Sequence, residues 1–269
     1  MDGDIFTTIE YISKDRVSDM RHMYSYLMGP ACLEAALDHS HEAETLKKDA
    51  LRLLHSLPDD TGATTLHRCV SARSDNDDIL IRVSCSKDCQ VQNDEVRLPM
   101  LRQQKPGPEG YTLCLSDYVN PAGSSIGLFA TCCTLAANPD DDPFTCLLTQ
   151  TMATRLAEAA AEKLDHDIQG KPIGMPLTGI RPAIGYPSLP DLSINFLLDE
   201  LLDMTASGMT ITENGAMIPL ASVSGLMIPH PKARYFSIGT IGEEQFRDYA
   251  RRRQFSADRL RPFLRSILN

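Results

Sequence analysis

The sequence predicts a mixed fold in which an antiparallel β-sheet forms the middle of the molecule and helices flank it. Two apolar runs, Leu66 to Val70 and Ile79 to Val83, enclose the polar stretch 74–78, which is typical of antiparallel strands joined by a turn. Further along, apolar residues recur at helical spacing from about residue 142 to residue 167. We expect the chain to fold around this sheet and this long helix.

The first 57 residues are expected to be helical. Two helical patterns, Val17 to Leu27 and Leu33 to Leu57, are separated by a break at Gly29-Pro30. We therefore expect a helical N-terminal cap over residues 1–44, followed by one larger domain over residues 45–269.

The remaining elements follow from the same two periodicities. The long helix opens at Asp142-Pro143, where proline occupies the first turn and its missing N–H costs least. Pro262 lies inside the last helix, where it costs about 3 kcal/mol or forces a kink. The other expected elements are strands at 111–115 and 126–135, a helix at 194–204, strands at 209–211, 223–228 and 235–241, a helix at 243–253, and a last helix capped by Ser256.

Composition excludes several classes of function. The net charge is −10, from 36 acidic and 26 basic residues, so most of the surface would repel a nucleic-acid backbone. We find no apolar run long enough to cross a bilayer and no basic secretory leader, and we expect a cytoplasmic protein. The eight cysteines are scattered through apolar stretches, as in a reducing compartment, and we expect no metal site. No G-x-G-x-x-G, Walker or nucleophile-elbow sequence occurs, and we expect no catalytic side chain.

A stiff loop rich in proline and glycine runs from residue 179 to residue 191, with the sequence GIRPAIGYPSLPD. Proline fixes φ and lacks a backbone donor, so this stretch cannot form a regular helix or a central strand. Arg181 and Tyr186 are held on this loop and have little freedom left to lose, so a ligand would find them already in place. The sequence therefore predicts a binding loop.

The string Arg-Pro-Ala-x-Gly-Tyr-Pro at residues 181–187 resembles the S-adenosylmethionine-binding signature of the activation domain of cobalamin-dependent methionine synthase. Other segments match that family in order and spacing, so the resemblance spans roughly residues 45 to 263. They include Leu115 to Val119 (LSDYV), Arg155 to Ala159 (RLAEA), Ala221 to Gly225 (ASVSG), His230-Pro231, and Asp248 to Arg252 (DYARR). The chain departs from the family pattern at Met175 and Leu192, where the family carries glutamate and histidine, and it contains no tryptophan.

The resemblance implies an α+β fold, with an antiparallel sheet and flanking helices around a concave face. It also implies a cofactor-binding site for S-adenosylmethionine. The implied site residues are Asp117, Arg155, Glu158, Arg181, Gly185, Tyr186 and Tyr235. Such a ligand needs a guanidinium for its carboxylate, acidic groups for its ammonium and ribose, and aromatic faces for its sulfonium or base. Taken singly, Asp117 could instead cap a turn, Arg155 and Glu158 could form a surface ion pair, and Arg181 could pair with a surface carboxylate.

The resemblance further implies a role in methyl transfer. In the family, the activation domain presents S-adenosylmethionine to an inactivated cobalamin while flavodoxin supplies an electron. This chain is too short to carry the cobalamin module, so it would act in trans on a separate cobalamin-binding methionine synthase chain. Arginines gather near its C-terminal end, where they could attract flavodoxin or another acidic reductase, or could simply form a solvated helix face. The alternative function is a non-catalytic module that senses S-adenosylmethionine or serves as a scaffold.

Overall fold

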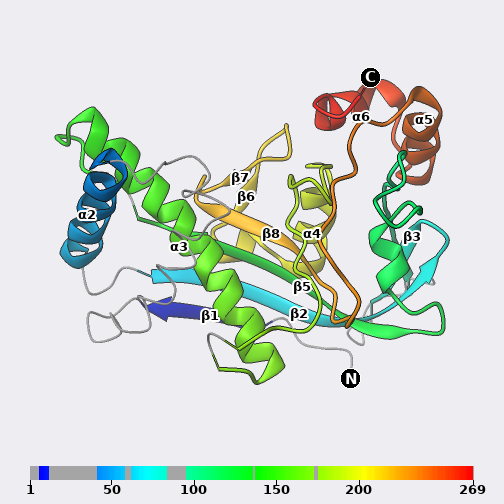
Figure 1. The fold of residues 1–269 in the computed structure, drawn as a ribbon, viewed down its shortest axis with the longest axis horizontal. Helices are drawn as coiled ribbons and strands as arrows, with labels where there is room; N and C mark the ends of the chain where they lie inside the picture. Colours follow the sequence, from blue (N-terminus) through cyan, green and yellow to red (C-terminus); the bar gives the residue numbers. More distant parts are fainter. Residues whose placement is uncertain are drawn as a thin grey trace.

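A long strand, β2 (Gly62–Asp75), organises the sheet at the centre of the molecule (Figure 1). The structure, a computed structural model, describes residues 6–11, 41–57, 62–83, 95–135, 137–172 and 175–268. The other strands of the main sheet are β1 (Phe6–Tyr11), β3 (Asp78–Arg82), β4 (Glu95–Pro99), β5 (Ser124–Cys133) and β8 (Ser222–Met227). Five of these six antiparallel strands lie in the order β4-β3-β2-β5-β8, and β1 pairs with β2 beside that path. Two short strands, β6 (Thr210–Ile211) and β7 (Met217–Ile218), pair with each other.

Strand β2 is long enough to carry three neighbours. Its first half pairs with β1 and its last residues pair with β3, so β1 and β3 share one edge of β2, and β5 follows the other edge. The turn from β2 into β3 is Asn76-Asp77, and Asn76 has a φ of 54°, a left-handed conformation that asparagine tolerates. The hairpin predicted from the polar stretch 74–78 is confirmed.

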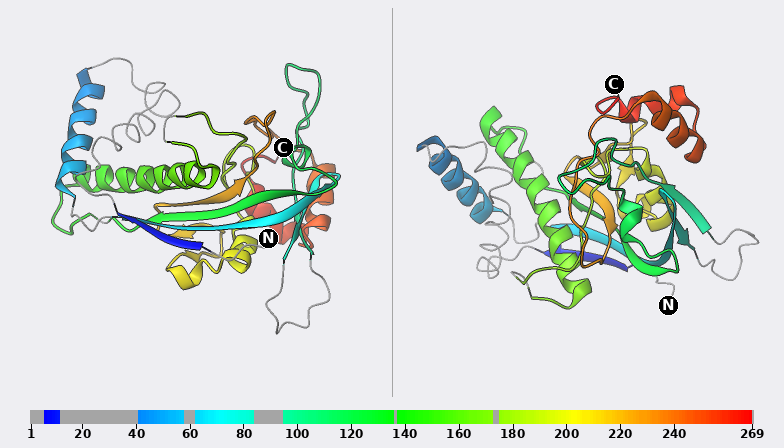
Figure 2. Two further views of the ribbon diagram at one scale, coloured as in Figure 1. Left: turned by 90° about the horizontal axis from the view of Figure 1, so that it is seen from below. Right: turned by 45° about the vertical axis from the view of Figure 1, so that its right-hand side comes forward.

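Helices cover both faces of the sheet. Helix α3 (Pro143–Gln169) crosses one face and α4 (Ile194–Leu202) packs on the opposite face, while α2 (His41–Ser56) lies beside α3 (Figure 2). The Thr131 hydroxyl on β5 donates to the Ala157 carbonyl of α3 at 2.8 Å and ties this helix to the sheet. The carboxylate of Asp142 accepts the Phe144 N–H at 2.9 Å, so the predicted start of the long helix is confirmed. None of the described helices is long and apolar enough to cross a membrane.

Strand β5 is buried on both faces because helices lie on both sides of it. Its side chains alternate between the faces. Ile126, Leu128 and Ala130 belong to the main core, whereas Phe129 faces α3 and packs with Ala161. The α3 side therefore holds a smaller apolar layer, and the cavity described below opens beside it.

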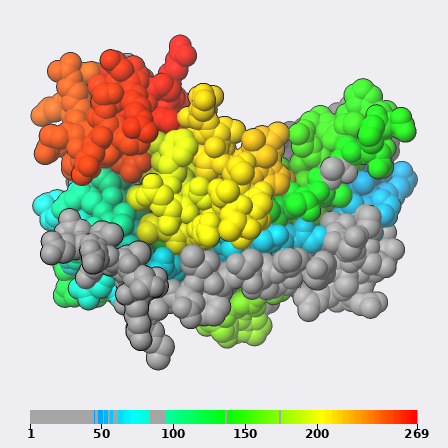
Figure 3. Space-filling view, turned by 180° about the vertical axis from the view of Figure 1, so that it is seen from behind, coloured from blue at the N-terminus to red at the C-terminus, as the bar shows by residue number. Residues whose placement is uncertain are grey.

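A pair of C-terminal helices, α5 (Glu243–Arg252) and α6 (Ala257–Leu264), stands as a lobe at one end of the molecule (Figure 3). The Tyr249 hydroxyl donates to the buried Asp191 carboxylate at 2.8 Å, and Arg252 forms an ion pair with the buried Asp78 of β3. The Ser256 side chain accepts the Arg259 N–H, so its predicted role as the cap of the last helix is confirmed.

Three expectations about secondary structure were wrong. Residues 6–11, expected to be helical, form β1 in the main sheet. The expected strand 111–115 is replaced by irregular chain and a short 3-10 helix, η3 (Leu115–Tyr118), because the Asp117 carboxylate takes the Cys114 N–H. Residues 235–241, which were expected to form a strand, pair with no neighbouring strand of the described sheet. Instead the Ile238 N–H donates to the Pro187 carbonyl in the loop over residues 179–191.

The expected N-terminal cap is only partly described. Helix α2 confirms the helical pattern for residues 41–56, whereas the expected helix over 17–27 lies outside the described residues. The division of the chain at residues 44 and 45 stays a prediction.

Candidate functional site

The loop over residues 179–191 is held against the outer edge of β8. Its carbonyl and N–H groups pair with the strand as a neighbouring strand would, although proline interrupts the ladder. The bonds run from Ile180 N to Ile228 O at 3.1 Å, from Ile228 N to Ile180 O at 2.9 Å, from Leu226 N to Pro182 O at 3.1 Å, and from Ile184 N to Ser224 O at 2.9 Å. The stiff loop predicted from the sequence is thus anchored along its first half.

Two glycines allow this close approach. A Cβ atom at Gly225 of β8 would lie 2.2 Å from the Pro182 carbonyl oxygen, so only glycine fits there. Gly185 has a φ of 87°, and a Cβ atom there would also lie 3.0 Å from the Leu192 side chain. Gly185 was expected in the site, and the structure gives it a conformational role in shaping the loop.

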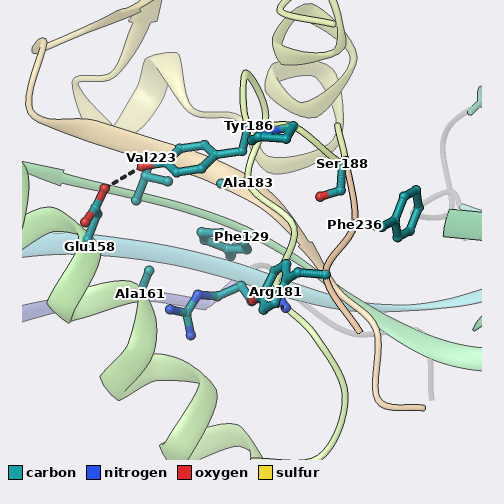
Figure 4. A pocket seen from close by; sticks show the side chains of 11 residues that line it. Phe129, Glu158, Ala161, Arg181, Ala183, Tyr186, Ser188, Val223 and Phe236 are labelled. Atoms are coloured by element: carbon teal, nitrogen blue, oxygen red, sulfur yellow. Dashed lines mark hydrogen bonds between the residues drawn. The ribbon is translucent and has the colours of Figure 1, made fainter. Parts of the chain in front are cut away.

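A cavity of about 520 Å³ opens between α3, the sheet and this loop, with part of its wall from residues 235–236 (Figure 4). This volume is typical of a site for a small molecule. Its floor is apolar, and its polar groups come from α3, the loop and the chain that follows β8. The lining residues are Phe129, Glu158, Ala161, Arg181, Ala183, Tyr186, Pro187, Ser188, Val223, Tyr235 and Phe236.

Glu158 and Tyr186 meet across the cavity. The Tyr186 hydroxyl donates to the Glu158 Oε1 at 2.5 Å, and this bond joins the loop to α3 (Figure 4). The Arg155 guanidinium, one turn earlier on α3, donates to the other oxygen of Glu158 at 3.0 Å. Arg155 is therefore placed to orient Glu158, and it is not among the residues that line the cavity in the described part of the chain.

Arg181 and Tyr235 form a second pair. The backbone N–H of Arg181 donates to the Tyr235 hydroxyl at 2.9 Å, which fixes an aromatic ring at the cavity although Tyr235 as a residue remains 63% exposed. The Arg181 side chain is only 11% exposed, and its guanidinium lies 3.4 Å from the Asp165 carboxylate and 4.0 Å from that of Glu162.

Asp117 lies elsewhere in this arrangement. Its carboxylate forms an ion pair with Arg102 at 2.6 Å and accepts the Cys114 N–H at 2.8 Å, so it caps η3. It does not line the cavity among the described residues, although its neighbour Tyr118 packs 6.5 Å from the ring of Phe236, which does. A contact between Asp117 and a ligand stays a prediction.

Four of the seven expected site residues therefore share one cavity: Glu158, Arg181, Tyr186 and Tyr235. Sequence reasoning missed Phe236, although it directly follows Tyr235, and it missed Phe129, which looks like any core residue of a buried strand. Of the two departures from the family pattern, Met175 is 57% exposed and away from the cavity lining, and Leu192 packs beside Gly185. Among the described residues, no group of three or more His, Cys, Asp or Glu could hold a metal ion.

Comparison with known proteins identifies the fold and the family. Residues 4–254 match the family model described as vitamin B12 dependent methionine synthase, activation domain. The chain belongs to this family. A crystal structure of the MetH reactivation domain bound to AdoHcy is similar over 98% of this chain and 90% of that chain, with a TM-score of 0.78 and 27% identity. The resemblance and the α+β fold, with an antiparallel sheet and flanking helices, are confirmed. The family match begins at residue 4, so it includes most of the stretch that we assigned to the cap.

Proposed function

We propose that this activation domain binds S-adenosylmethionine in the cavity and presents it to a cobalamin held by a separate methionine synthase chain. The observation that carries the proposal is the convergence of Glu158, Arg181, Tyr186 and Tyr235, from three distant segments, on one cavity of suitable size. The similar reactivation domain, whose structure contains AdoHcy, supports a ligand of the same nucleoside class.

The chemistry of the lining groups fits this ligand. The Arg181 guanidinium suits a carboxylate, and the Glu158 carboxylate suits an ammonium or the hydroxyls of a ribose. The rings of Tyr186 and Tyr235 offer faces for a sulfonium or a base, above a floor formed by Phe129. These residues would hold the ligand largely without rearrangement, because the loop is already bonded to β8.

S-adenosylmethionine, when bound, supplies an activated methyl group on its sulfonium. The residues of this chain then have to bind it, orient that methyl group outward and exclude water, and no general acid or base is required of them. Tyr186 is 48% exposed and Tyr235 is 63% exposed, so both rings reach from the cavity to the molecular surface. An opening of this kind supports a reaction with a group carried by another protein.

The basic C-terminal region supports a contact with an acidic reductase such as flavodoxin, but only some of its arginines are available for it. Arg252 forms ion pairs with Asp78 and Asp248, and Arg253 is 7% exposed and donates to the Ser193 carbonyl. Arg247 and Arg251 also pair with carboxylates, with Glu243 at 3.1 Å and with Asp248 at 2.6 Å, but their side chains are 73% and 76% exposed and can contact a partner. Reversing the charge of these two arginines should slow the reduction of cobalamin by flavodoxin more at low salt than at high salt. Equal slowing at both salt concentrations would contradict a contact between these arginines and flavodoxin.

Calorimetry with S-adenosylmethionine tests the proposal first. We expect binding to the wild-type protein, no measurable heat with Arg181→Ala, and weaker binding with Tyr186→Phe. Tyr111→Phe is the matched control, because Tyr111 is also exposed but lies outside the cavity lining. Absence of binding by the wild-type protein would refute the proposal.

A second experiment tests action in trans. With a cobalamin-bound methionine synthase chain and a reductant, the proposed function predicts that methylcobalamin forms only when this domain and S-adenosylmethionine are both present. Binding of the nucleoside without methylcobalamin formation would favour the alternative of a sensing or scaffold module.

A further inference from the structure

The end of the loop over residues 179–191 is bound to the C-terminal lobe, whereas its first half is bound to β8. Asp191, the last residue of the loop, has a side chain that is only 1% exposed. Its carboxylate accepts the Tyr249 hydroxyl of α5 at 2.8 Å, and the Arg253 guanidinium lies 3.5 Å from the same oxygen. Two different elements, β8 and the end of α5, therefore hold the two halves of the loop.

The buried carboxylate of Asp191 fixes the chain at this point. A carboxylate shielded from water is stable only where counter-charge and hydrogen bonds replace its lost hydration. Its Oδ1 accepts the Ser193 N–H at 2.8 Å, while Arg253 supplies the counter-charge and also donates to the Ser193 carbonyl at 3.1 Å. Burial raises the pKa of the Tyr249 phenol well above its ordinary value, so its hydroxyl remains a donor. Asp191 cannot move without losing these partners.

A tight turn connects Asp191 to Tyr186, which lines the cavity. The Tyr186 carbonyl accepts the Leu189 N–H at 2.9 Å, and the Leu189 carbonyl accepts the Gly185 N–H at 2.8 Å. Leu189 is buried in the main core, and only Pro190 separates it from Asp191. Because proline fixes φ, this short connection has little freedom to absorb a movement. A displacement of Asp191 would therefore be passed on to Tyr186.

We propose that Tyr249 and Arg253 are positioning residues, which act through Asp191 to hold Tyr186 in place at the cavity. In the described part of the chain these two residues and Asp191 are not among those that line the cavity, so they act on a ligand only through the loop. Tyr186 meets Glu158 through a hydrogen bond of 2.5 Å, and such a contact needs its partners placed to within about 0.5 Å. The effect on ligand affinity rests on the proposed binding of S-adenosylmethionine.

Tyr249→Phe tests the proposal, because it removes the hydroxyl that Asp191 accepts and keeps the ring. Calorimetry measures the dissociation constant for S-adenosylmethionine, and hydrogen exchange followed by mass spectrometry measures the opening of the loop segment 184–189 without ligand. Ser256→Ala is the control, because it weakens the same lobe at the cap of α6, where the Ser256 side chain accepts the Arg259 N–H. All measurements are made at a temperature at which each variant is fully folded. Tyr249→Phe is also combined with Tyr186→Phe.

We expect Tyr249→Phe to bind S-adenosylmethionine roughly three- to tenfold more weakly and to exchange the loop amides about tenfold faster, whereas Ser256→Ala changes neither. In the Tyr186→Phe background the loss of affinity should be smaller, because the hydroxyl that is being positioned is already absent.

The proposal is overturned if Tyr249→Phe leaves the affinity or the loop exchange at the wild-type level, which would indicate that its contact with Asp191 only attaches the lobe. It is also overturned if Ser256→Ala causes the same losses, or if the effects of Tyr249→Phe and Tyr186→Phe on affinity simply add. If the wild-type protein does not bind S-adenosylmethionine, the proposed function itself fails, and the exchange of the loop amides then decides whether Tyr249 holds the loop.

Discussion

Replacing Gly225 by alanine tests whether the loop over residues 179–191 depends on its close contact with β8. A Cβ atom at Gly225 would lie 2.2 Å from the Pro182 carbonyl oxygen and 2.9 Å from the Ala183 Cα. A carbon atom normally stays about 3.3 Å from a carbonyl oxygen, so the loop would have to move by about 1 Å. Both obstacles are backbone atoms, which cannot rotate out of the way as a side chain can.

This movement would break the two bonds that flank the contact, from Leu226 N to Pro182 O at 3.1 Å and from Ile184 N to Ser224 O at 2.9 Å. Each contributes about 1 kcal/mol net, and overpacking adds about 1–3 kcal/mol. We therefore expect the free energy of unfolding to fall by about 3–5 kcal/mol, which corresponds to a fall in melting temperature of about 10 °C or more for a chain of this size.

Thermal melting and calorimetry with S-adenosylmethionine measure both consequences. The Gly225→Ala variant should also bind at least about tenfold more weakly, because a displacement of 1 Å is enough to spoil a pre-formed site. Gly107→Ala is the matched control, since a Cβ atom there comes no closer than 3.9 Å to another atom. If Gly225→Ala melts within about 2 °C of the wild-type protein and binds equally well, the loop is not held in the way described.

Three further predictions concern stability. Tyr249→Phe removes the 2.8 Å bond to the buried Asp191 carboxylate, and chemical denaturation should show a loss of about 2 kcal/mol. Ser256→Ala removes the cap of α6 and should cost about 1 kcal/mol in the same assay, whereas Ser256→Asp should cost less. Burial lowers the pKa of His67 below its ordinary value of 6.5. As the pH falls below 6.5, the unfolded chain therefore takes up a proton at His67 more readily than the folded protein does. The stability that is present above pH 6.5 is then lost. His67→Gln should therefore flatten the decline in melting temperature between about pH 7 and pH 5, and an unchanged decline would show that His67 does not cause it.

The elements that could be predicted from the sequence are those with local signals. The hairpin at Asn76-Asp77, the capped start of α3 at Asp142 and the cap at Ser256 each depend on residues within a few positions, and all are confirmed. The stretches 111–115 and 235–241 have the apolar content of strands but form none. Their backbone groups bond to Asp117 and to Pro187, which are partners that no periodicity could reveal.

The candidate site also contains some residues that could be predicted from the sequence and others that could not. Glu158, Arg181, Tyr186 and Tyr235 were predictable because polar and aromatic residues in a family pattern stand out. Phe129 could not be predicted as a site residue. It is a buried apolar residue on β5, and in the sequence it looks the same as its neighbours in the core. The proximity of Arg181 to the Glu162 and Asp165 carboxylates could not be predicted either, because it depends on how the loop packs against α3.

The cavity takes its walls from stretches that lie far apart along the chain, from Phe129 to Phe236. Contacts between such distant residues form only after long segments have closed on one another, which makes the cavity a late product of folding. A nucleoside that recognises the finished cavity would therefore slow the unfolding of the domain and leave its refolding rate nearly unchanged. Ligand supply would then govern how long each folded copy survives.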